Sequence, residues 1–358
     1  MWWLDCCPPL LSPPLNISPA NRAALGWANL GGYACQEPPT HALQAVVFET
    51  AQQCGIPMHD TAVDYGRGFA EEGLGLAIAN STANRAALRI QSKVLRQIVR
   101  EQSAIAYREK DLWRCPLPYQ DWSTTWDWSY EGVLRQAAES RERLQVAYHD
   151  GLALHDPAEA VREAGMRLGD LGTTALAALK DLKEQGQLRA IGIGTKEIPI
   201  VLELLDLYPG VFDYLMIMNY NLLDHEQALD YLIPRCAEMG IELFLAGPYA
   251  SGILAAPMDC SGSFYYRIPS QQVLGKVRTL NNLAREFGLS SLKPVAVRFV
   301  AAQPAFTKIV FGGRSPDELR ENFSYMNSAI PAPFWKRLRQ VEVDGKLLIH
   351  PNAPLPDE

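Results

Sequence analysis

The chain has 358 residues, of which 48% are hydrophobic and 20% charged, and its formal net charge of −7 is spread without long blocks of one sign. This composition is typical of a folded globular protein, and the mildly acidic balance argues against nucleic acid as a partner. No stretch is long and apolar enough to cross a bilayer, so membrane association is not expected either.

The opening segment, MWWLDCCPPLLSPPLN, carries four prolines and no basic start. It therefore lacks the features of a signal peptide, and residues 1–21 are predicted to form a Pro-rich arm. Seven cysteines, an odd number without metal-site spacing, are typical of reduced thiols and favour a cytoplasmic protein with no bound metal.

From about residue 22 the chain alternates short β-rich runs with helical segments. The patterns predict strands near residues 23–32, 56–60, 87–94, 148–156, 188–195, 212–219, 241–247 and 306–313. They predict helices near residues 41–55, 71–80, 133–145, 174–187, 198–210, 225–240, 270–303 and 315–326.

Eight such units over residues 22–328 predict an α/β protein, a (β/α)8 TIM barrel within one domain, followed by a tail at 329–358. The alternative is an open doubly wound sheet, which usually carries a glycine-rich phosphate loop after its first strand. The nearest motif, GIGTKE at 192–197, lacks the third glycine and equally suits a tight turn at a strand end.

Two long segments interrupt this alternation and are expected to lie as loops over the C-terminal face of the barrel. Residues 102–130 hold four of the eight tryptophans, and residues 247–269 are rich in glycine, serine and aromatic residues. The tryptophans either line a substrate site or pack the long loop onto the barrel rim.

Titratable residues stand at three successive strand ends: Asp60 with Tyr65 behind it, Lys93, and His155. Each has an ordinary structural explanation, such as a turn cap, a rim aromatic, an outward-pointing lysine or a loop histidine. On one barrel, however, all four converge at a single mouth. Lys93 is expected to lower the pKa of the Tyr65 phenol, Asp60 to balance Lys93, and His155 to orient a substrate oxygen. Such a set handles a proton at an alcohol or carbonyl oxygen, which implies hydride chemistry.

The motifs DTAVDYG, EEGLGLAI, QSKV, LALHDP and VFGGRSPDELREN resemble those of the aldo-keto reductase superfamily. The segments WDWSYEGVLRQAAESRERL, GIELFLAGPYASGIL and IPSQQVLGKV resemble its aldose-oxidising branch, the D-threo-aldose (L-fucose) and L-galactose 1-dehydrogenases, with pyridoxal 4-dehydrogenase-like members. The resemblance implies that Tyr65 is the general acid/base, Lys93 its partner, Asp60 the counter-ion and His155 the orienting residue.

The segment GGRSPDELREN also predicts a capped helix whose N-terminus can hold a phosphate, with Ser315 as N-cap and Glu318 completing a capping box. The resemblance implies a nicotinamide cofactor, NAD or NADP, and a carboxylate at Glu318 favours NAD because it repels a 2′-phosphate. Arg314 limits that preference, since a guanidinium can pair with the phosphate. The expected cofactor-binding residues are Asn219, Gly247, Pro248, Ser251, Gly252, Gly312, Gly313, Arg314, Ser315, Glu318 and Asn322.

The resemblance implies an enzyme that oxidises the C1 hydroxyl of an aldose, of L-fucose, L-galactose or D-arabinose type, to the aldonolactone. The alternatives are a pyridoxal 4-dehydrogenase-like enzyme, a general aldehyde reductase, and a non-catalytic dinucleotide-binding regulatory subunit. Trp27, Trp126 and Trp128 are the predicted substrate contacts. The partner is a small sugar or aldehyde, and the protein is expected to be a monomer or homodimer.

Overall fold

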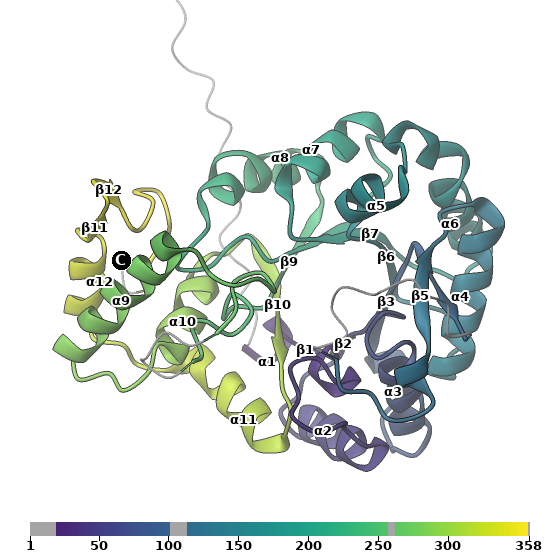
Figure 1. Cartoon of the computed structure of the whole chain (residues 1–358), viewed down its shortest axis with the longest axis horizontal. Coiled ribbons are helices and arrows are strands. Elements are labelled where there is room, and N and C mark those ends of the chain that lie inside the picture. Colours follow the sequence, from purple (N-terminus) through teal and green to yellow (C-terminus); the bar gives the residue numbers. More distant parts are fainter. Residues whose placement is uncertain (1–18, 101–112, 257–261, 357–358) are drawn as a thin grey trace, which may run out of the picture.

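Eight short strands form a closed parallel barrel, as the alternation of strands and helices predicts (Figure 1). The computed structural model describes residues 19–100, 113–256 and 262–356. The barrel strands are β1 (Ala23–Gly26), β2 (Met58–Asp60), β3 (Arg89–Val94), β6 (Gly151–His155), β7 (Ile191–Thr195), β8 (Tyr214–Ile217), β9 (Glu242–Ala246) and β10 (Phe306–Gly312). Strand β10 pairs with both β9 and β1 and closes the ring. The predicted (β/α)8 barrel is therefore confirmed.

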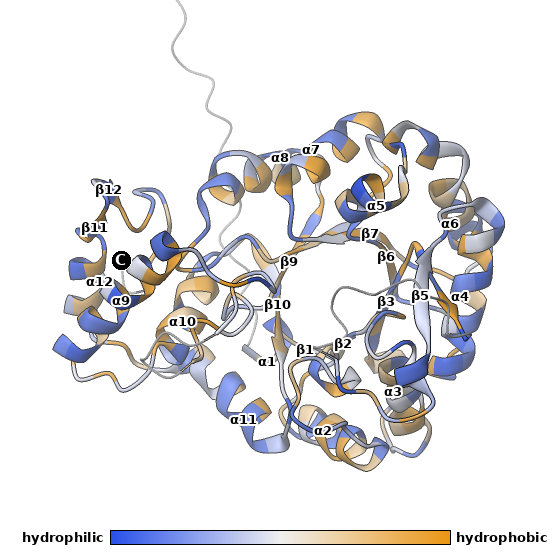
Figure 2. Ribbon diagram, viewed as in Figure 1, coloured by the Kyte–Doolittle hydropathy of each residue, from blue (hydrophilic) through white to orange (hydrophobic). Residues whose placement is uncertain are grey.

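The predicted helices surround the barrel because each turns an apolar face toward the strands. Figure 2 shows this pattern as orange on the barrel side of the helices and blue on their outer side. These helices are α2 (His41–Gln53), α3 (Phe69–Ala79), α4 (Tyr130–Leu144), α6 (Ala175–Glu184), α7 (Ile198–Leu207), α8 (Ile233–Met239) and α11 (Pro316–Ser324). A π-helical turn at Ala228–Leu232 leads directly into α8.

The helical region predicted at 270–303 is two helices, α9 (Gln271–Glu286) and α10 (Lys293–Ala302). The break falls at Gly288, whose φ of +72° suits a helix end, and Pro294 opens the second helix. A short helix that we did not predict, α5 (Pro157–Ala164), follows β6. The short helix α1 (Pro19–Arg22) precedes β1, and residues 1–18 of the predicted arm lie outside the described residues.

The segment predicted as a tail is partly built into the core. It contains helix α12 (Ala332–Leu338), whose Phe334 and Trp335 are buried, and a two-stranded sheet of β11 (Glu342–Val343) and β12 (Lys346–Leu347). Helices α9 and α12 pack together beside the barrel, where Figure 1 shows them as a separate lobe of the ribbon.

The barrel buries both faces of its strands, as parallel strands generally do. One face fills the barrel interior with Ala24, Met58, Ala153, Tyr214, Met216, Phe244 and Val310. The other face joins the larger core between strands and helices, to which Leu25, Ile90 and Leu154 belong. A closed barrel interior leaves the strand ends as the place where a ligand can bind.

The two ends of the insertion after β3 pair as antiparallel strands, β4 (Arg96–Val99) and β5 (Ser123–Trp126). Residues 101–112 of this insertion lie outside the described residues. The hairpin is tied to the loop after β2, because the Thr124 hydroxyl donates to the Asp64 carboxylate at 2.9 Å.

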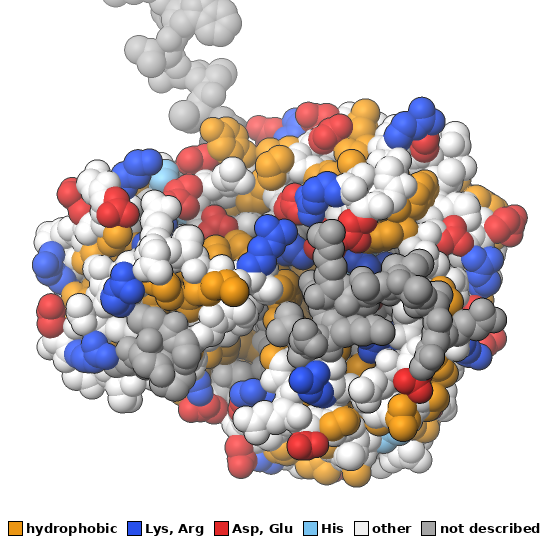
Figure 3. All heavy atoms as spheres, in the orientation of Figure 1, with side chains coloured by type: hydrophobic (Ala, Val, Ile, Leu, Met, Phe, Trp, Pro, Cys, Tyr) orange, Lys and Arg blue, Asp and Glu red, His pale blue; other side chains and the backbone are white. Residues whose placement is uncertain are grey.

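Acidic and basic side chains are interspersed over the face drawn in Figure 3. Among the residues that the structure describes, no helix has the length and apolar character needed to cross a membrane.

Candidate active site

A cavity of about 470 Å³ opens at the carboxyl ends of the barrel strands. Its lining draws on the ends of several strands and on the loops that follow them, with Gly26, Asp60, Lys93, His155, Thr195 and Gly312 at the strand ends. Tyr65 also lines this cavity, so the structure brings the four predicted catalytic residues together.

Asp60 and Lys93 form a buried ion pair across β2 and β3. The Lys93 ammonium donates to both carboxylate oxygens of Asp60, at 3.0 and 2.8 Å, and to the carbonyl oxygen of Thr61 at 2.8 Å. Both side chains are at most 5% exposed. Burial raises the pKa of Asp60 above its ordinary value, and the adjacent Lys93 opposes that rise.

Tyr65 lies in the turn between β2 and α3, where two glycines allow close backbone packing. Gly66 has a φ of +68°, and a Cβ at that position would lie 2.5 Å from the carbonyl oxygen of Gly31. A Cβ on Gly31 would in turn lie 2.8 Å from the Tyr65 backbone. The Tyr-Gly pair in the sequence thus lets the loop after β1 pack directly against the residue that carries the phenol.

The surroundings of the Tyr65 phenol favour its neutral form on balance. The Lys93 ammonium lies over the ring, 4.7 Å from its centroid, while its hydrogen bonds go to Asp60 and Thr61. Burial raises the pKa of Tyr65 well above its usual value, and the carboxylates of Asp60, Asp156 and Asp64 raise it further. Desolvation and three acidic neighbours thus outweigh the lowering expected from Lys93, and the pKa of Tyr65 is raised instead.

His155 ends β6 and faces Tyr65 edge-on, with ring centroids 5.9 Å apart. Burial, followed by the charges of Lys93, Arg96 and Lys196, holds the pKa of His155 well below its usual range, so the imidazole is neutral at neutral pH. A neutral imidazole has one N–H and can donate a single hydrogen bond to an oxygen beside Tyr65.

The far end of the cavity is formed by the N-terminus of α11. Ser315 is the N-cap, because its hydroxyl accepts from the Glu318 N–H at 3.2 Å, as predicted. The Glu318 carboxylate bonds the backbone N–H of Arg314 at 2.7 Å, one residue before the position that a capping box would satisfy. It also pairs with the Arg314 guanidinium at 2.6 Å. Arg314 and Glu318 thus face the cavity as a mutually neutralised pair.

This end of the cavity fits a dinucleotide. Gly247, Pro248, Ser251, Gly252, Gly312, Arg314, Glu318 and Asn322 line it. The Ser251 hydroxyl is buried and has no hydrogen-bond partner among the described residues, which is expected of a group that binds a ligand oxygen. Asn322 is held in place by Tyr249, whose hydroxyl donates to the amide oxygen at 2.6 Å, and by the carbonyl of Gly312 at 3.0 Å.

Three predicted cofactor residues do not line the cavity: Asn219, Gly313 and Ser315. Ser315 instead caps helix α11, whose N-terminus forms the far end of the cavity. The Asn219 amide donates to Asp224 at 3.0 Å. Gly313 packs next to Leu319 of α11.

The three predicted substrate tryptophans also lie elsewhere. Trp27 is fully buried, and its indole N–H donates to His59 behind the strands at 3.2 Å. Trp126 lies on the hairpin, where the Arg96 guanidinium stacks on its ring at 3.8 Å, and its indole N–H donates to Glu163. Trp128 packs against the main core. None of the three lines the cavity.

Aromatic residues form the wall of the mouth: Trp113, from the tryptophan-rich segment expected either to line the site or to pack on the rim, and Tyr33 and Tyr266, which were not predicted. Tyr33, Trp113 and Tyr266 meet edge-to-face, with centroids 5.1 to 5.4 Å apart, and Trp113 stacks on the Tyr65 ring at 6.0 Å. These rings line a smaller adjoining cavity of about 60 Å³, which also borders His155.

Tyr266 is presented by an unusual two-residue turn. Phe264 and Arg267 exchange two backbone hydrogen bonds, and the two residues between them, Tyr265 and Tyr266, have φ of +48° and +65°. Glycine or asparagine is usual at such positions. The Tyr265 hydroxyl donates to Asp224 at 2.6 Å and anchors the turn.

Comparison with known proteins assigns the family. The aldo/keto reductase family model matches residues 23–343, and the chain belongs to that family. It is therefore an oxidoreductase of a family that uses nicotinamide cofactors.

The curated relatives include two enzymes that cover most of the chain. A pyridoxal 4-dehydrogenase from Microbacterium luteolum is 29% identical over 326 residues, which is 88% of this chain and 92% of that protein. A D-threo-aldose 1-dehydrogenase from a Pseudomonas species is 26% identical over 301 residues, or 83% and 87% of the two chains. The solved structure of a glycerol dehydrogenase from Gluconobacter oxydans superposes with a TM-score of 0.64 at 19% identity, covering 88% of this chain and 89% of that one. At that identity the structural likeness supports the fold alone.

Proposed function

We propose that the protein is an NAD(P)-dependent aldose 1-dehydrogenase that oxidises a cyclic hemiacetal at its anomeric carbon to the lactone. The observation that carries the proposal is the convergence of Tyr65, His155 and the Lys93–Asp60 pair in one cavity, which also reaches the N-terminal end of α11. The similarity to a D-threo-aldose 1-dehydrogenase supports the choice of substrate.

In this proposal the two cavity residues act on one substrate oxygen. His155 donates a hydrogen bond to the anomeric oxygen and orients it, and Tyr65 takes the hydroxyl proton during oxidation or returns it during reduction. A nicotinamide cofactor, when bound at this mouth, would supply the hydride acceptor for C1, which would balance the two electrons lost as the C–O bond becomes a carbonyl. Lys93 neutralises the buried Asp60 and links the ends of β2 and β3 next to the phenol ring.

The raised pKa of Tyr65 leads to a directional pH dependence. Oxidation needs the phenolate as base, and a pKa well above 10 leaves little phenolate at neutral pH. We expect kcat/KM for oxidation to rise by about tenfold per pH unit between pH 7 and 9. Reduction uses the neutral phenol as the acid, so kcat/KM for reduction should not change over the same pH range. Initial rates in both directions would test this, and an oxidation rate that levels off near pH 7 would contradict it.

Preference for NAD over NADP is proposed to depend on Glu318. Replacing Glu318 by glutamine removes the negative charge and frees the Arg314 guanidinium to pair with a 2′-phosphate. We expect the ratio of kcat/KM for NADP to that for NAD to increase about tenfold or more.

The matched control for this prediction is Asp317→Asn, which makes the same charge change in the same helical turn but on a side chain that does not line the cavity. An unchanged cofactor ratio in Glu318→Gln, or an equal change in both variants, would remove Glu318 from the specificity argument.

The proposed activity is tested by absorbance at 340 nm with NAD or NADP and a panel of L-fucose, D-arabinose, L-galactose, other aldoses and pyridoxal at mildly alkaline pH. Growth of the signal with an aldose is the expected result. No signal with any aldose, together with reduction of simple aldehydes, would replace the proposal by a general aldehyde reductase. Tight cofactor binding without turnover in either direction would instead favour a non-catalytic dinucleotide-binding subunit.

A second candidate, oxidation of pyridoxal as its cyclic hemiacetal, is favoured by the aromatic wall of Tyr33, Trp113 and Tyr266, which can stack on a flat ring. The similarity to a pyridoxal 4-dehydrogenase supports it as well. Signal with pyridoxal alone in the same panel would select this candidate.

A further inference from the structure

Asp156 follows the predicted catalytic His155 and neither gives nor takes the proton in the transfer proposed above. It occupies the N-cap position of α5, and aspartate is among the residues preferred there. Its side chain nevertheless makes no cap hydrogen bond. Instead, Asp156 lines both the large cavity and the smaller adjoining one.

The backbone of Asp156 adopts an uncommon conformation. Its φ is +45° and its ψ +55°, in the left-handed region, directly before Pro157. A residue other than glycine in this region is uncommon, although aspartate tolerates it better than most. The conformation is fixed by the backbone: its N–H donates to the carbonyl of Gly194 at 2.9 Å, and its carbonyl accepts from Glu159 at 2.9 Å. Strain of this kind is typical of residues held for a functional purpose.

The Asp156 carboxylate is close to two potential donors but bonds neither. One oxygen lies 3.8 Å from His155 Nε2 and 3.8 Å from Lys196 Nζ, both beyond hydrogen-bond distance. Within the part of the chain that the structure describes, this carboxylate accepts no hydrogen bond. Burial raises its pKa to about 6, so it is ionised under alkaline assay conditions.

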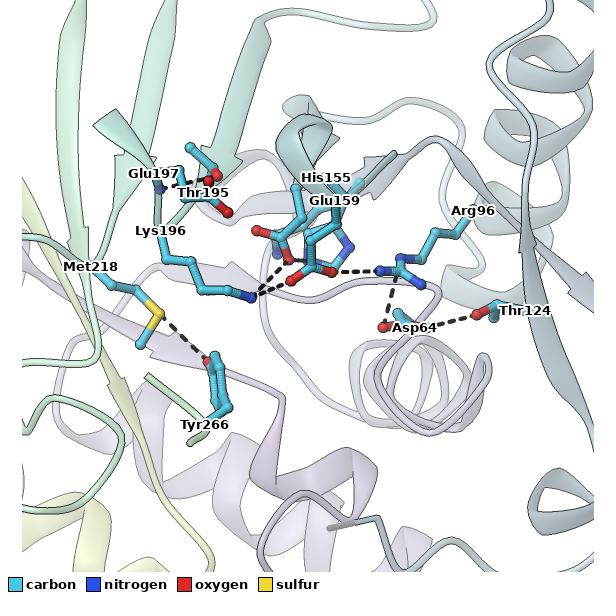
Figure 4. Close-up of polar contacts among 12 residues, drawn as sticks. Asp64, Arg96, Thr124, His155, Glu159, Thr195, Lys196, Glu197, Met218 and Tyr266 are labelled. Atoms are coloured by element: carbon cyan, nitrogen blue, oxygen red, sulfur yellow. Dashed lines mark hydrogen bonds and ion pairs between the residues drawn. The ribbon is translucent and has the colours of Figure 1, made fainter. Parts of the chain in front are cut away.

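The charged side chains next to Asp156 pair with one another. Figure 4 shows Lys196 extending from the end of β7 to Glu159, and Arg96 lying between Glu159 and Asp64. Lys196 donates to Glu159 at 2.5 Å and Arg96 donates to Glu159 at 3.0 Å. Glu159 is thus engaged by two cations, while Asp156 presents an ionised acceptor to the cavity.

The smaller cavity places aromatic rings beside this acceptor, since Tyr33, Trp113 and Tyr266 line it together with Asp156. An acceptor next to flat aromatic walls suits a ring that carries hydroxyls.

We propose that Asp156 accepts a hydrogen bond from the substrate hydroxyl on the carbon next to the one oxidised, the C2 hydroxyl of an aldose. The inference rests on the proposed function, in which His155 holds the anomeric oxygen. Oxygens on neighbouring ring carbons lie close together, so two side-chain groups 3.8 Å apart can each contact one of them. The site therefore selects for a C2 hydroxyl and for its configuration.

The test compares sugars that differ only at C2. D-arabinose and D-ribose are C2 epimers that share 2-deoxy-D-ribose as their deoxy analogue, and L-fucose is paired with 2-deoxy-L-fucose. We expect wild-type kcat/KM for the preferred sugar to exceed that for its 2-deoxy analogue by about 10- to 100-fold. In Asp156→Asn this ratio should fall by about tenfold or more, because the amide is a weaker, uncharged acceptor.

The ratio of kcat/KM for a sugar to that for its 2-deoxy analogue separates recognition of the C2 hydroxyl from effects on proton transfer. The Asp156 carboxylate also raises the pKa of Tyr65, so its removal alters proton transfer. That effect is the same for both sugars at one pH and cancels in the ratio. The control is Glu163→Gln, which makes the same chemical change on α5 in a residue that lines neither cavity and should leave the ratio unchanged.

The remaining outcomes are distinct. An equal loss of activity on both sugars in Asp156→Asn would overturn the inference and leave the proposed function standing. Wild-type enzyme that oxidises pyridoxal but no sugar would also overturn it. Wild-type enzyme that oxidises no hemiacetal at all would overturn the proposed function, and this inference with it.

Discussion

Replacement of Tyr65 by phenylalanine is expected to lower kcat for both oxidation and reduction by about 10²- to 10⁴-fold, the usual contribution of a general acid or base. The variant keeps the aromatic ring that stacks on Trp113 and lies beneath the Lys93 ammonium, so packing should be preserved. It removes only the hydroxyl that exchanges the proton. Steady-state rates in both directions, with cofactor affinity from fluorescence titration, would measure the effect.

The control for this variant is Tyr208→Phe, which removes a phenol hydroxyl outside the cavity, where it donates to the carbonyl of Leu168 at 2.6 Å. Activity of Tyr65→Phe near the wild-type level would show that another group handles the proton. A large loss of cofactor affinity would show that the hydroxyl acts in binding.

Replacement of Lys93 by methionine is expected to lower the free energy of unfolding by about 3–5 kcal/mol. The change leaves the Asp60 carboxylate, which is 5% exposed, without its counter-charge in the interior. Chemical denaturation at pH 8 gives the most sensitive measurement, because Asp60 is ionised in the unfolded chain at that pH and must be buried without a counter-charge on folding.

The comparison for this variant is Lys183→Met, which removes an ammonium paired with Asp213 at the surface, where both side chains are 39% exposed. That change should cost at most about 1 kcal/mol. The double variant Asp60→Asn/Lys93→Met should recover part of the stability lost in Lys93→Met, because no unpaired charge remains. Equal effects of Lys93→Met and Lys183→Met would mean that the buried pair contributes no more than a surface pair.

The barrel and the convergence of its strand ends could be predicted because they follow from local patterns. Asp60, Lys93 and His155 each stand at a strand end, and the ends of parallel barrel strands meet at one mouth. The cap of α11 could be predicted for the same reason, since Ser315 and its bond to Glu318 lie within one helical turn.

The positions of Tyr33 and Tyr266 in the wall of the mouth could not be predicted, because they depend on contacts between residues far apart in the sequence. Tyr33 and Tyr266 meet although 233 positions separate them, and nothing in their local sequence marks the encounter. The expectation that Trp27 contacts the substrate is wrong for a related reason. A residue just past a strand end can turn outward, and Trp27 packs behind the strands. The pKa of Tyr65 depends on carboxylates from two different loops, which only the folded chain brings near.

The turn that carries Tyr265 and Tyr266 has a consequence for how this protein can change. Two left-handed tyrosines cost about 1–2 kcal/mol each relative to residues that prefer that conformation. Asparagine and glycine in place of Tyr265 and Tyr266 would relieve the strain of the turn and raise stability. They would also remove the Tyr266 ring from the mouth and the hydrogen bond from Tyr265 to Asp224. Thermal stability and the aromatic wall of the mouth are therefore coupled at this point in the chain. Selection for one property here alters the other.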